Sequence, residues 1–583
     1  MQDSEVNCLL RDVPSFDEKE EERPPALLSI SSGVQLTDHF LCSDSQLSRI
    51  EKLLQEAECQ PYINPHPTTL FPTSEELKLG HGTTISDGIA ELGGAGASDE
   101  VLLQLLPYWI EATQNSGEET ARAWGQTLLG KFDVSSSFSP LLDRIRLAKD
   151  RIAGLSNSRS TQFSRSAHYM GSKASLAPYL AEIIHTLLPE DTVLFDLMCG
   201  SGAAAGYFAR AWKTYASDAQ AFSKLLAKVQ GGGMDFQTSV NMADKVLEAA
   251  RQHFEHIPKF VLENIDVESE FLSAELSDSV KHDLHLWISN YPRVNTKSAA
   301  REPVFEDLVK DRATSHTVKP YLLFSVYYAN LFFGVRQAAE IDSLRYAIDK
   351  TLVGEEHEWA MGALICAVST CAYSYGGHFA QPKVDGADRE RLNNLASELM
   401  VTRAYSVSHE FFVRLTSLGE ESSKVKFPVG LVSGPWEKAI DEFSSTGDHK
   451  VCVYLDPPYT RDEYSRYYHV LETLVRYDYP VVQDKASMPK RGDAGRFASD
   501  FATRNISKIE DLIVEIISVC LRKKWSCLWS YSSTGVASIE NILRRLSFEA
   551  TDVHIFNMAH SYKGQGKHKS KSVTEYAILI KGS

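Results

Sequence analysis

The chain has 583 residues, of which 43% are hydrophobic and 23% are charged, a balance typical of a globular protein with about three or four domains. Its formal net charge of −17 argues against a protein that coats nucleic acid non-specifically, but it leaves room for a local basic groove. No apolar run is long enough for a membrane span, the N-terminus lacks a signal pattern and the nine cysteines form no C-x-x-C pair, so we expect a cytoplasmic protein with neither a membrane partner nor a zinc site.

The first 155 residues contain no motif that carries chemistry. Residues 1–30 are acidic and bounded by prolines ("DEKEEERPP"), which favours a disordered tail. Residues 31–155 form an N-terminal accessory region, and the helical spacing of "SDEVLLQLLPYWIEATQ" and "SPLLDRIRLAKDRIAGL" predicts two helices there. The polar, breaker-rich stretch Ser156–His168 is typical of a linker.

Strands and helices alternate over residues 156–225. The pattern predicts a helix in "ASLAPYLAEIIHTLL", a strand with a glycine turn in "DTVLFDLMCGSG", a helix in "AAAGYFARAW" and a short strand in "KTYASD". Such alternation indicates a parallel sheet covered by helices, which is the α/β class. Residues 226–424 interrupt this pattern with a long, mostly helical stretch.

The α/β pattern resumes over residues 425–583. Strands are predicted in "FPVGLVSG", "KVCVYLDPPY" and "SCLWSYS", with helices near 505–523 and 536–547. The last two apolar runs, "DVHIFNM" and "EYAILIKG", are separated by a loop rich in glycine and lysine and suit a terminal antiparallel pair.

The turn after "FDLMCGSG" has the features of a ligand site. Asp196 ends the strand, and Gly200 and Gly202 allow the backbone to approach a ligand closely, although many such turns carry glycine for packing alone. Asp218 follows at the end of the next strand, where an acid roughly 20 residues beyond a glycine turn can hold a ribose hydroxyl pair or can simply cap a helix. Together the turn and the acid favour an adenosine-bearing cofactor.

The segment "YLDPPY" ends a buried strand on an acid. Asp456 precedes Pro457 and Pro458, whose fixed φ angles hold the following carbonyl groups in one arrangement, and Tyr459 comes next. The carboxylate and a carbonyl can accept both hydrogens of an exocyclic amine while the tyrosine stacks on its ring. Such acceptors localise the lone pair of an aromatic amine, which makes it a better nucleophile. The alternative is a rigid turn with a capping acid.

Residues 165–583 resemble Dam-like N6-adenine DNA methyltransferases of the restriction–modification or phage-defence type. The resemblance rests on five segments and on their order along the chain, which is "HYMGSK", "FDLMCGSG", "SDAQAF", "YLDPPY" and "SVTEYAILI". The resemblance implies a Rossmann-like methyltransferase sheet with a helical insertion that recognises the target, S-adenosyl-L-methionine as cofactor, and double-stranded DNA and other subunits of a defence system as partners. It implies cofactor contacts by Tyr169, Lys173, Asp196, Gly200, Gly202 and Asp218. It implies that Asp456, Pro457, Pro458 and Tyr459 hold a flipped adenine.

The chain departs from the family pattern at two places. The family usually has phenylalanine where Met198 stands. It often has an acid after the third strand, where this chain offers Ser433, Gly434 and Pro435. The second departure concerns the residue that the family uses to bind the adenine amine of the cofactor.

Two basic segments are candidates for phosphate contacts, with a solvated surface loop as the alternative. Their residues are Lys485, Lys490, Arg491 and Arg496 in the first, and Lys563 and Lys567 in the second. The aromatic run Tyr464–His469 and His378 suit packing rather than catalysis.

The sequence therefore predicts an enzyme that transfers a methyl group to adenine N6 in duplex DNA after base flipping. Methylation of cytosine N4 or of RNA adenine uses the same chemistry and is the nearest alternative. A non-catalytic DNA-binding subunit of a defence complex is the alternative from another class.

Overall fold

A computed structural model describes residues 11–12, 167, 169, 171–294, 320–422, 425–444, 450–459, 463–483, 485–546, 552–563 and 570–582. The expected accessory region 31–155 and its two helices lie outside the described residues, as does most of the expected linker. Of the expected acidic tail, the structure describes β1 (Arg11–Asp12), which pairs in parallel with β7.

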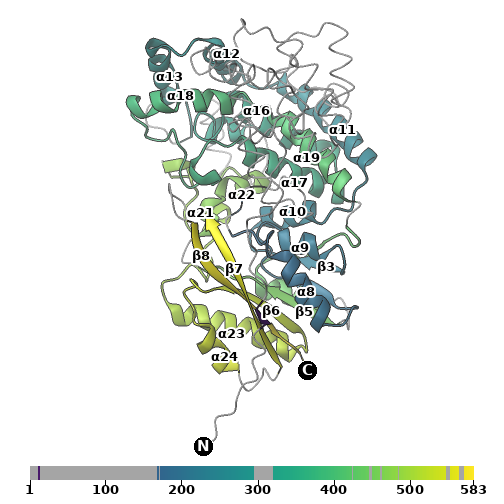
Figure 1. Ribbon diagram of the computed structural model, residues 1–583. Coiled ribbons are helices and arrows are strands. Elements are labelled where there is room, and N and C mark those ends of the chain that lie inside the picture. The colour runs from purple at the N-terminus through teal and green to yellow at the C-terminus, as the bar shows by residue number, and fades with distance from the viewer. Residues whose placement is uncertain are drawn as a thin grey trace, which may run out of the picture.

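One sheet with the strand order β1-β7-β8-β6-β5-β2-β3-β4 organises the molecule (Figure 1). Its central strands are parallel, whereas β8 runs antiparallel between β6 and β7. The strands are β2 (Val193–Asp196), β3 (Thr214–Ala216), β4 (Gly430–Leu431), β5 (Val451–Leu455), β6 (Ser526–Ser532), β7 (Val553–Lys563) and β8 (Ser570–Ile580). This is the Rossmann-like methyltransferase sheet that the sequence predicts, and β7 and β8 extend into the segment expected to be a loop.

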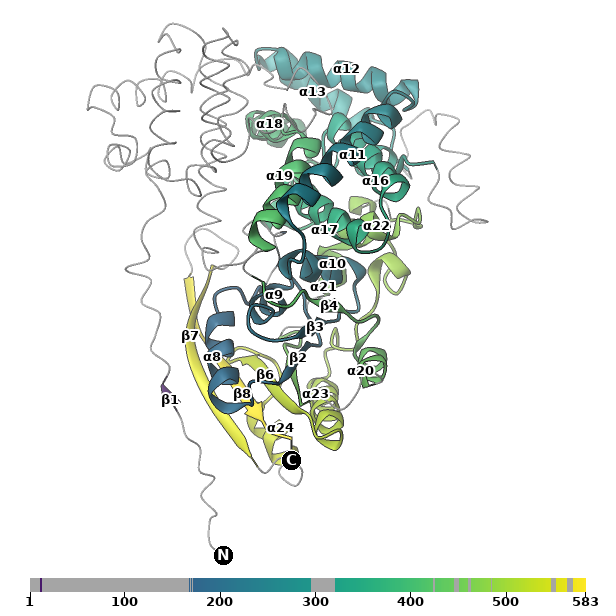
Figure 2. The same cartoon turned by 90° about the vertical axis from the view of Figure 1, so that its right-hand side faces the viewer.

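Helices cover both faces of the sheet (Figures 1 and 2). On one face lie α8 (Ala177–Leu187) and α9 (Ala203–Phe208), and on the other lie α20 (Trp436–Ser444), α23 (Ile506–Arg522) and α24 (Ile539–Leu546). Successive side chains of a strand point to opposite faces. In β5, accordingly, Cys452 and Tyr454 join the core beneath α8 and α9, while Val453 and Leu455 join the core beneath α23.

The large helical insertion lies between β3 and β4 and stands above the sheet in Figure 1. Its core also includes side chains of α22 (His469–Arg476), which follows β5. The helices from β3 onward are α10 (Ala221–Gln230), α11 (Phe236–Phe254), α12 (Lys259–Ser273), α13 (Asp278–Asn290), α15 (Leu323–Tyr327), α16 (Val335–Thr351), α17 (Gly354–Cys371), α18 (Arg389–Arg403) and α19 (Val407–Glu421). The insertion is therefore packed against the segment that follows the Asp456 strand.

Buried hydrogen bonds reinforce the contact between the helical insertion and α22. The Asp342 carboxylate of α16 accepts hydrogen bonds from the backbone amides of Phe324 and Ser325 and from the hydroxyl of Tyr477. Burial raises the pKa of Asp342 to about 6, while these donors oppose the rise. The Asp342 carboxylate therefore links α15 and α16 to the end of α22.

The aromatic run after β5 belongs mainly to the core. It forms two short helices, α21 (Tyr464–Tyr467) and α22, rather than the single helix that its spacing suggests. Tyr468 is buried, and His469 is buried with its Nε2 atom 3.0 Å from the carbonyl oxygen of Phe379. His378 is also buried and packs edge-on against Tyr467. Within the described ranges, no helix has both the length and the apolarity needed to cross a membrane.

Candidate active site

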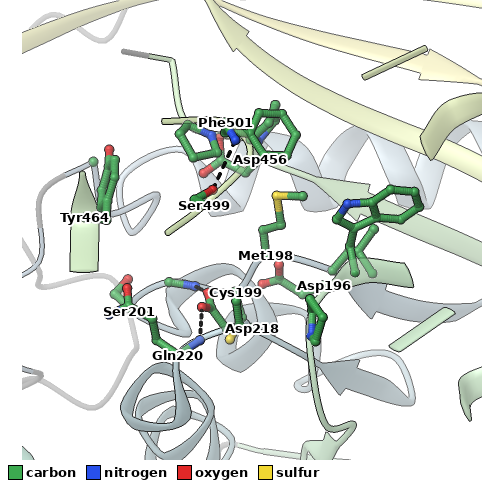
Figure 3. Close-up of a pocket in the computed structure, with 18 of the residues that line it drawn as sticks. Asp196, Met198, Cys199, Ser201, Asp218, Gln220, Asp456, Tyr464, Ser499 and Phe501 are labelled. Atoms are coloured by element: carbon green, nitrogen blue, oxygen red, sulfur yellow. Dashed lines mark hydrogen bonds between the residues drawn. The ribbon is translucent and has the colours of Figure 1, made fainter. Parts of the chain in front are cut away.

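A cavity of about 350 Å³ opens where β2, β3 and β5 end. This volume lies within the range of small-molecule sites, roughly 300–1,000 Å³. In Figure 3, Asp196, Cys199 and Asp218 lie on one side of the cavity, Asp456, Ser499 and Phe501 lie on the opposite side, and Met198 projects between them. The structure therefore brings the two predicted motifs to one cavity.

Asp196 is the most deeply buried acid in this wall. Its residue is 1% exposed, and the backbone amides of Met198 and Ala205 favour the ionised form of its carboxyl group. Burial, together with the negative charges of Asp456 and Asp218, raises the pKa of Asp196 well above its usual value. A buried carboxylate in a cavity shared with two other acids is suited to a cationic ligand.

The two glycines of the turn have different surroundings, although both adopt positive φ angles, +51° for Gly200 and +74° for Gly202. Gly200 lines the cavity, and a Cβ atom there would lie 2.9 Å from the ring of Tyr169. Gly202 does not line the cavity, and a Cβ atom there would lie 2.3 Å from the Cα atom of Ala227 in α10. Gly202 therefore serves the close packing of α9 on α10, whereas Gly200 leaves space at the cavity wall.

Asp218 joins the turns that follow β2 and β3. One of its carboxylate oxygens accepts a hydrogen bond from the Gly200 amide at 3.1 Å, and the other accepts one from the Gln220 amide at 2.9 Å (Figure 3). Burial raises the pKa of Asp218, and these two amides oppose the rise. Each carboxylate oxygen can accept a second hydrogen bond. Asp218 thus shapes the turn and can still accept ligand hydroxyl groups from the cavity.

Lys173 lies against the Asp456 turn. Its ammonium is 2.9 Å from Asp456 Oδ2 and 4.5 Å from the centre of the Tyr459 ring. Lys173 is 5% exposed and Asp456 17%, so this ion pair is shielded from solvent. The sequence predicts a cofactor contact for Lys173, and the residue does line the cavity, but its charge is matched by Asp456. A ring that stacks on this face of Tyr459 must displace the ammonium.

The prolines hold Tyr459 close to Asp456. Pro457 and Pro458 line the cavity, and the Tyr459 hydroxyl lies 2.7 Å from Asp456 Oδ1. The ring of Tyr459 packs edge-on against Tyr531 of β6, with the ring centres 5.1 Å apart. Burial and the negative charge of Asp456 raise the pKa of Tyr459 well above its usual value, so its hydroxyl keeps its hydrogen.

Tyr169 belongs to an aromatic stack at the edge of the cavity. Its ring is parallel to that of Tyr468, with the centres 4.7 Å apart, and also stacks with Tyr464 at 6.1 Å. Both Tyr169 and Tyr464 line the cavity. This stack fixes the side chain that a substituent at Gly200 would meet.

Sequence reasoning missed several lining residues. Trp436 and Glu437 follow Pro435 at the start of α20. An acid therefore does reach the cavity after the third strand of the predicted α/β pattern, which is β4, two positions beyond Pro435. Phe497 and Phe501 line the other side. The signal for Trp436 and Glu437 was present in "SGPWEK", whereas nothing in the loop around Phe497 distinguishes its aromatic rings from ordinary packing residues.

The basic residues of the first predicted segment differ in their environment. Lys485, Lys490 and Arg491 are exposed, and the loop that carries the last two continues into the cavity wall at Phe497. Arg496 forms a bidentate ion pair with Glu463, at 2.7 and 3.1 Å, so its charge is balanced within the chain, and Arg491 lies 3.8 Å from the same carboxylate. In the second segment, Lys563 ends β7 and Lys567 lies outside the described residues.

Comparison with known proteins identifies relatives, although no family model matches the chain. Over 425 residues it is 21% identical to the type II methyltransferase M.FokI of Planomicrobium okeanokoites. The aligned region covers 71% of this chain and 52% of the relative. Over 424 residues it is 23% identical to the modification methylase StsI of Streptococcus sanguinis, and the aligned region covers 71% of this chain and 51% of that relative. The chain thus spans about half the length of these curated relatives. The chain is therefore similar to part of two proteins that are named as methyltransferases.

Proposed function

We propose that this protein transfers a methyl group from S-adenosyl-L-methionine to the N6 amine of adenine in duplex DNA, as the modification enzyme of a restriction–modification or phage-defence system. The observation that carries this proposal is that Asp456, Pro457, Pro458 and Tyr459 line the same cavity as Gly200 and Asp218. The similarity to two type II methyltransferases supports the reaction class.

The residues on the β2 and β3 side fit the proposed cofactor. S-adenosyl-L-methionine carries two positive charges, on its sulfonium and its ammonium, and would supply an electrophilic methyl group when bound. Asp196 offers a buried carboxylate, and Gly200 leaves room at the wall. Asp218 would accept the ribose hydroxyls, and Glu437 would accept the adenine amine.

The Asp456 turn would bind the target amine. A base inside a duplex must leave the stack to reach this cavity, and Tyr459 would replace part of the lost stacking. Asp456 and the Pro457 carbonyl would accept the two amine hydrogens, which localises the nitrogen lone pair for attack on the methyl carbon. The methylated amine nitrogen is positively charged until it loses a proton, and Asp456 is placed to accept that proton.

The helical insertion is the part of the chain proposed to recognise the target sequence. Within this division, residues 156–225 and 425–583 form the catalytic domain, residues 226–424 form the target-recognition insertion, and residues 1–30 and 31–155 are a tail and an accessory region. The insertion packs on α22, directly after the aromatic run that follows the Asp456 turn, so its position suits contacts with DNA around a flipped base.

Label transfer tests this proposal against its alternatives. Purified protein is incubated with S-adenosyl-L-methionine labelled in the methyl group and with duplex DNA or RNA of mixed sequence. The proposal predicts label in duplex DNA. Label in RNA alone would refute the DNA assignment. A protein that binds DNA but neither transfers label nor binds the cofactor would support the alternative of a non-catalytic subunit.

The affinity for S-adenosyl-L-methionine is expected to increase as the pH rises. The raised pKa of Asp196 means that its carboxyl group holds a proton up to a higher pH than usual, and a cationic ligand favours the ionised form. Binding therefore releases a proton until the pH exceeds the raised pKa. Calorimetry over a pH series measures this trend, and Asp196→Asn should weaken binding and flatten the dependence. An equally steep dependence in Asp196→Asn would assign the titration to another group.

Exposed basic residues of the loop that continues into the cavity wall are expected to contact phosphate. Lys490→Ala should reduce the slope of log affinity against log salt concentration by about 1, because one phosphate contact is lost. Arg496→Ala should change the slope less, since Glu463 already balances that charge. Lys450→Ala is the control for a lysine away from the cavity, because Lys450 immediately precedes β5, at the opposite end of that strand from Asp456, where its ammonium lies 3.1 Å from Asp191. Equal slopes for Lys490→Ala and Lys450→Ala would remove this loop from the DNA interface.

A further inference from the structure

The loop between α22 and α23 supplies one wall of the cavity. Phe497, Ser499 and Phe501 belong to this loop, and all three line the cavity. The helical elements in the described part of the loop are two turns of three residues each, η5 (Lys485–Ser487) and η6 (Ala494–Arg496). The backbone bonds of long helices and strands therefore fix little of this wall, and its position depends on side-chain contacts with the rest of the site.

An ion pair joins the beginning of this wall to the segment that follows the Asp456 turn. Glu463 lies between Tyr459 and α21 and itself lines the cavity, while Arg496 directly precedes Phe497. The guanidinium donates two hydrogen bonds to the carboxylate, from Nε to Oε1 at 2.7 Å and from Nη2 to Oε2 at 3.1 Å. A bidentate contact of this kind fixes the orientation of both partners.

Further hydrogen bonds hold both ends of the wall. At its beginning, the hydroxyl of the buried Ser465 donates to the carbonyl oxygen of Phe497 at 2.8 Å. At its end, Arg491 Nη2 donates to the carbonyl oxygen of Ala502 at 3.2 Å. Arg491 Nε also lies 3.8 Å from Glu463 Oε2. Two arginines of the loop therefore converge on Glu463, an acid that lies outside the loop.

Partial burial distinguishes this ion pair from those on the surface. The side chains of Glu463 and Arg496 are 16% and 12% exposed, whereas those of the Asp511–Arg545 pair are 58% and 40% exposed. An ion pair at an exposed position is screened by solvent and contributes little to stability, and a shielded one is screened less. Arg496 Nη1 also donates to the carbonyl oxygen of Pro489 at 3.3 Å. The same guanidinium thus joins two points of the loop to Glu463.

We propose that Glu463 and Arg496 are positioning residues that hold the wall formed by residues 497–502 in place for the target nucleotide. This wall lies on the same side of the cavity as Asp456 and opposite Asp218, so it borders the part of the cavity that would receive the target base (Figure 3). A wall that is already in place does not have to be ordered when the base enters. The ion pair itself follows from the geometry, and its service to a target nucleotide rests on the proposed function.

A double-mutant cycle tests this role in the reaction. We expect Glu463→Met and Arg496→Met each to raise the KM for duplex DNA about tenfold, the effect of one lost hydrogen bond between charged groups. The double variant should be no worse than either single variant, because the same contact is already lost. The affinity for S-adenosyl-L-methionine, measured by calorimetry, should be unchanged in all three variants.

Glu463→Met separates position from charge. Removal of an acid near bound DNA would by charge alone strengthen DNA binding, so a raised KM in this variant reports the position of the wall. A KM that falls or stays the same in Glu463→Met would overturn the proposal. Losses that add in the double variant, or a cofactor affinity that falls as much as the KM for DNA rises, would overturn it as well.

Hydrogen exchange followed by mass spectrometry tests the wall without any activity. The backbone amides of Gly492, Arg496 and Ala502 donate to carbonyl oxygens within the loop, so their exchange reports its opening. In Arg496→Met, peptides that cover residues 489–502 should exchange about tenfold faster than in the wild-type protein, whereas peptides of β5 should not change. Unchanged exchange of the loop, or an equal increase in β5, would overturn the proposal.

Arg545→Met is the control for this measurement. It breaks the exposed pair with Asp511 between α24 and α23 and should leave the exchange of residues 489–502 unchanged. Because exchange is measured on the free protein, a wild-type protein that transfers no methyl group would count against the proposed function. The exchange result would still decide whether Glu463 and Arg496 hold the wall.

Discussion

Replacement of Asp456 by asparagine is expected to lower methyl transfer by about 10²–10³-fold, by analogy with the loss of one preorganised group at a transition state. Asparagine keeps the shape and one acceptor oxygen but removes the charge that would receive the amine hydrogens. The affinity for S-adenosyl-L-methionine should change little, because Asp456 lies on the side of the cavity opposite Asp218 (Figure 3). Single-turnover label transfer and calorimetry measure the two effects separately.

The Lys173 ion pair gives the same variant a second, structural consequence. Without Asp456, the Lys173 ammonium is left 5% exposed and without the anion that balances it. Breaking such a shielded pair costs about 3–5 kcal/mol when both partners are fully buried, and less in this pair because Asp456 is partly exposed. Thermal denaturation must therefore accompany the kinetics. Asp511→Asn, at an exposed position of α23, is the control, and near wild-type turnover in folded Asp456→Asn would refute the mechanism.

Gly202→Val is expected to prevent folding or to lower the free energy of unfolding by about 2–6 kcal/mol, as the sum of backbone strain and overpacking. The φ angle of +74° is unfavourable for valine, and its Cβ atom would lie 2.3 Å from the Ala227 Cα atom and 2.6 Å from the Ala227 nitrogen. These neighbours are backbone atoms of α10 and cannot turn aside. The loss should be visible in soluble yield and in the melting temperature before any ligand is added.

Gly386→Val separates the two contributions to this loss. Gly386 has a similar φ angle of +61°, and a Cβ atom there meets nothing within 4 Å. This variant should show the strain alone, so its destabilisation should be clearly smaller than that of Gly202→Val. Equal destabilisation of the two would mean that packing on α10 does not set the requirement for glycine at position 202.

The sequence predicted those parts of the molecule that depend on local pattern. Buried apolar runs that end in an acid located β2, β3 and β5. Parallel strands bring their carboxyl ends to one edge, and the structure places Asp196, Asp218 and Asp456 at one cavity there. The antiparallel pairing of β7 and β8 was also correctly expected, although both strands are longer than their apolar runs.

Contacts between distant segments could not be predicted in the same way. The pairing of Lys173 with Asp456 and the approach of Glu575 to Tyr459 depend on how the sheet orders its strands, and no local pattern encodes that order. The close approach of Gly202 to Ala227 of α10 is another such contact, and a role of Gly202 in cofactor binding stays a prediction. These are the features for which the three-dimensional structure is needed.

The identity of the methylated nucleoside tests the central claim most directly. Duplex DNA is treated with the protein and labelled S-adenosyl-L-methionine, digested to nucleosides and analysed by mass. The proposed function predicts N6-methyladenine in duplex DNA at one defined sequence, and no product with Asp456→Asn at matched concentrations of folded protein. N4-methylcytosine as the main product would contradict the assignment of adenine as the target base.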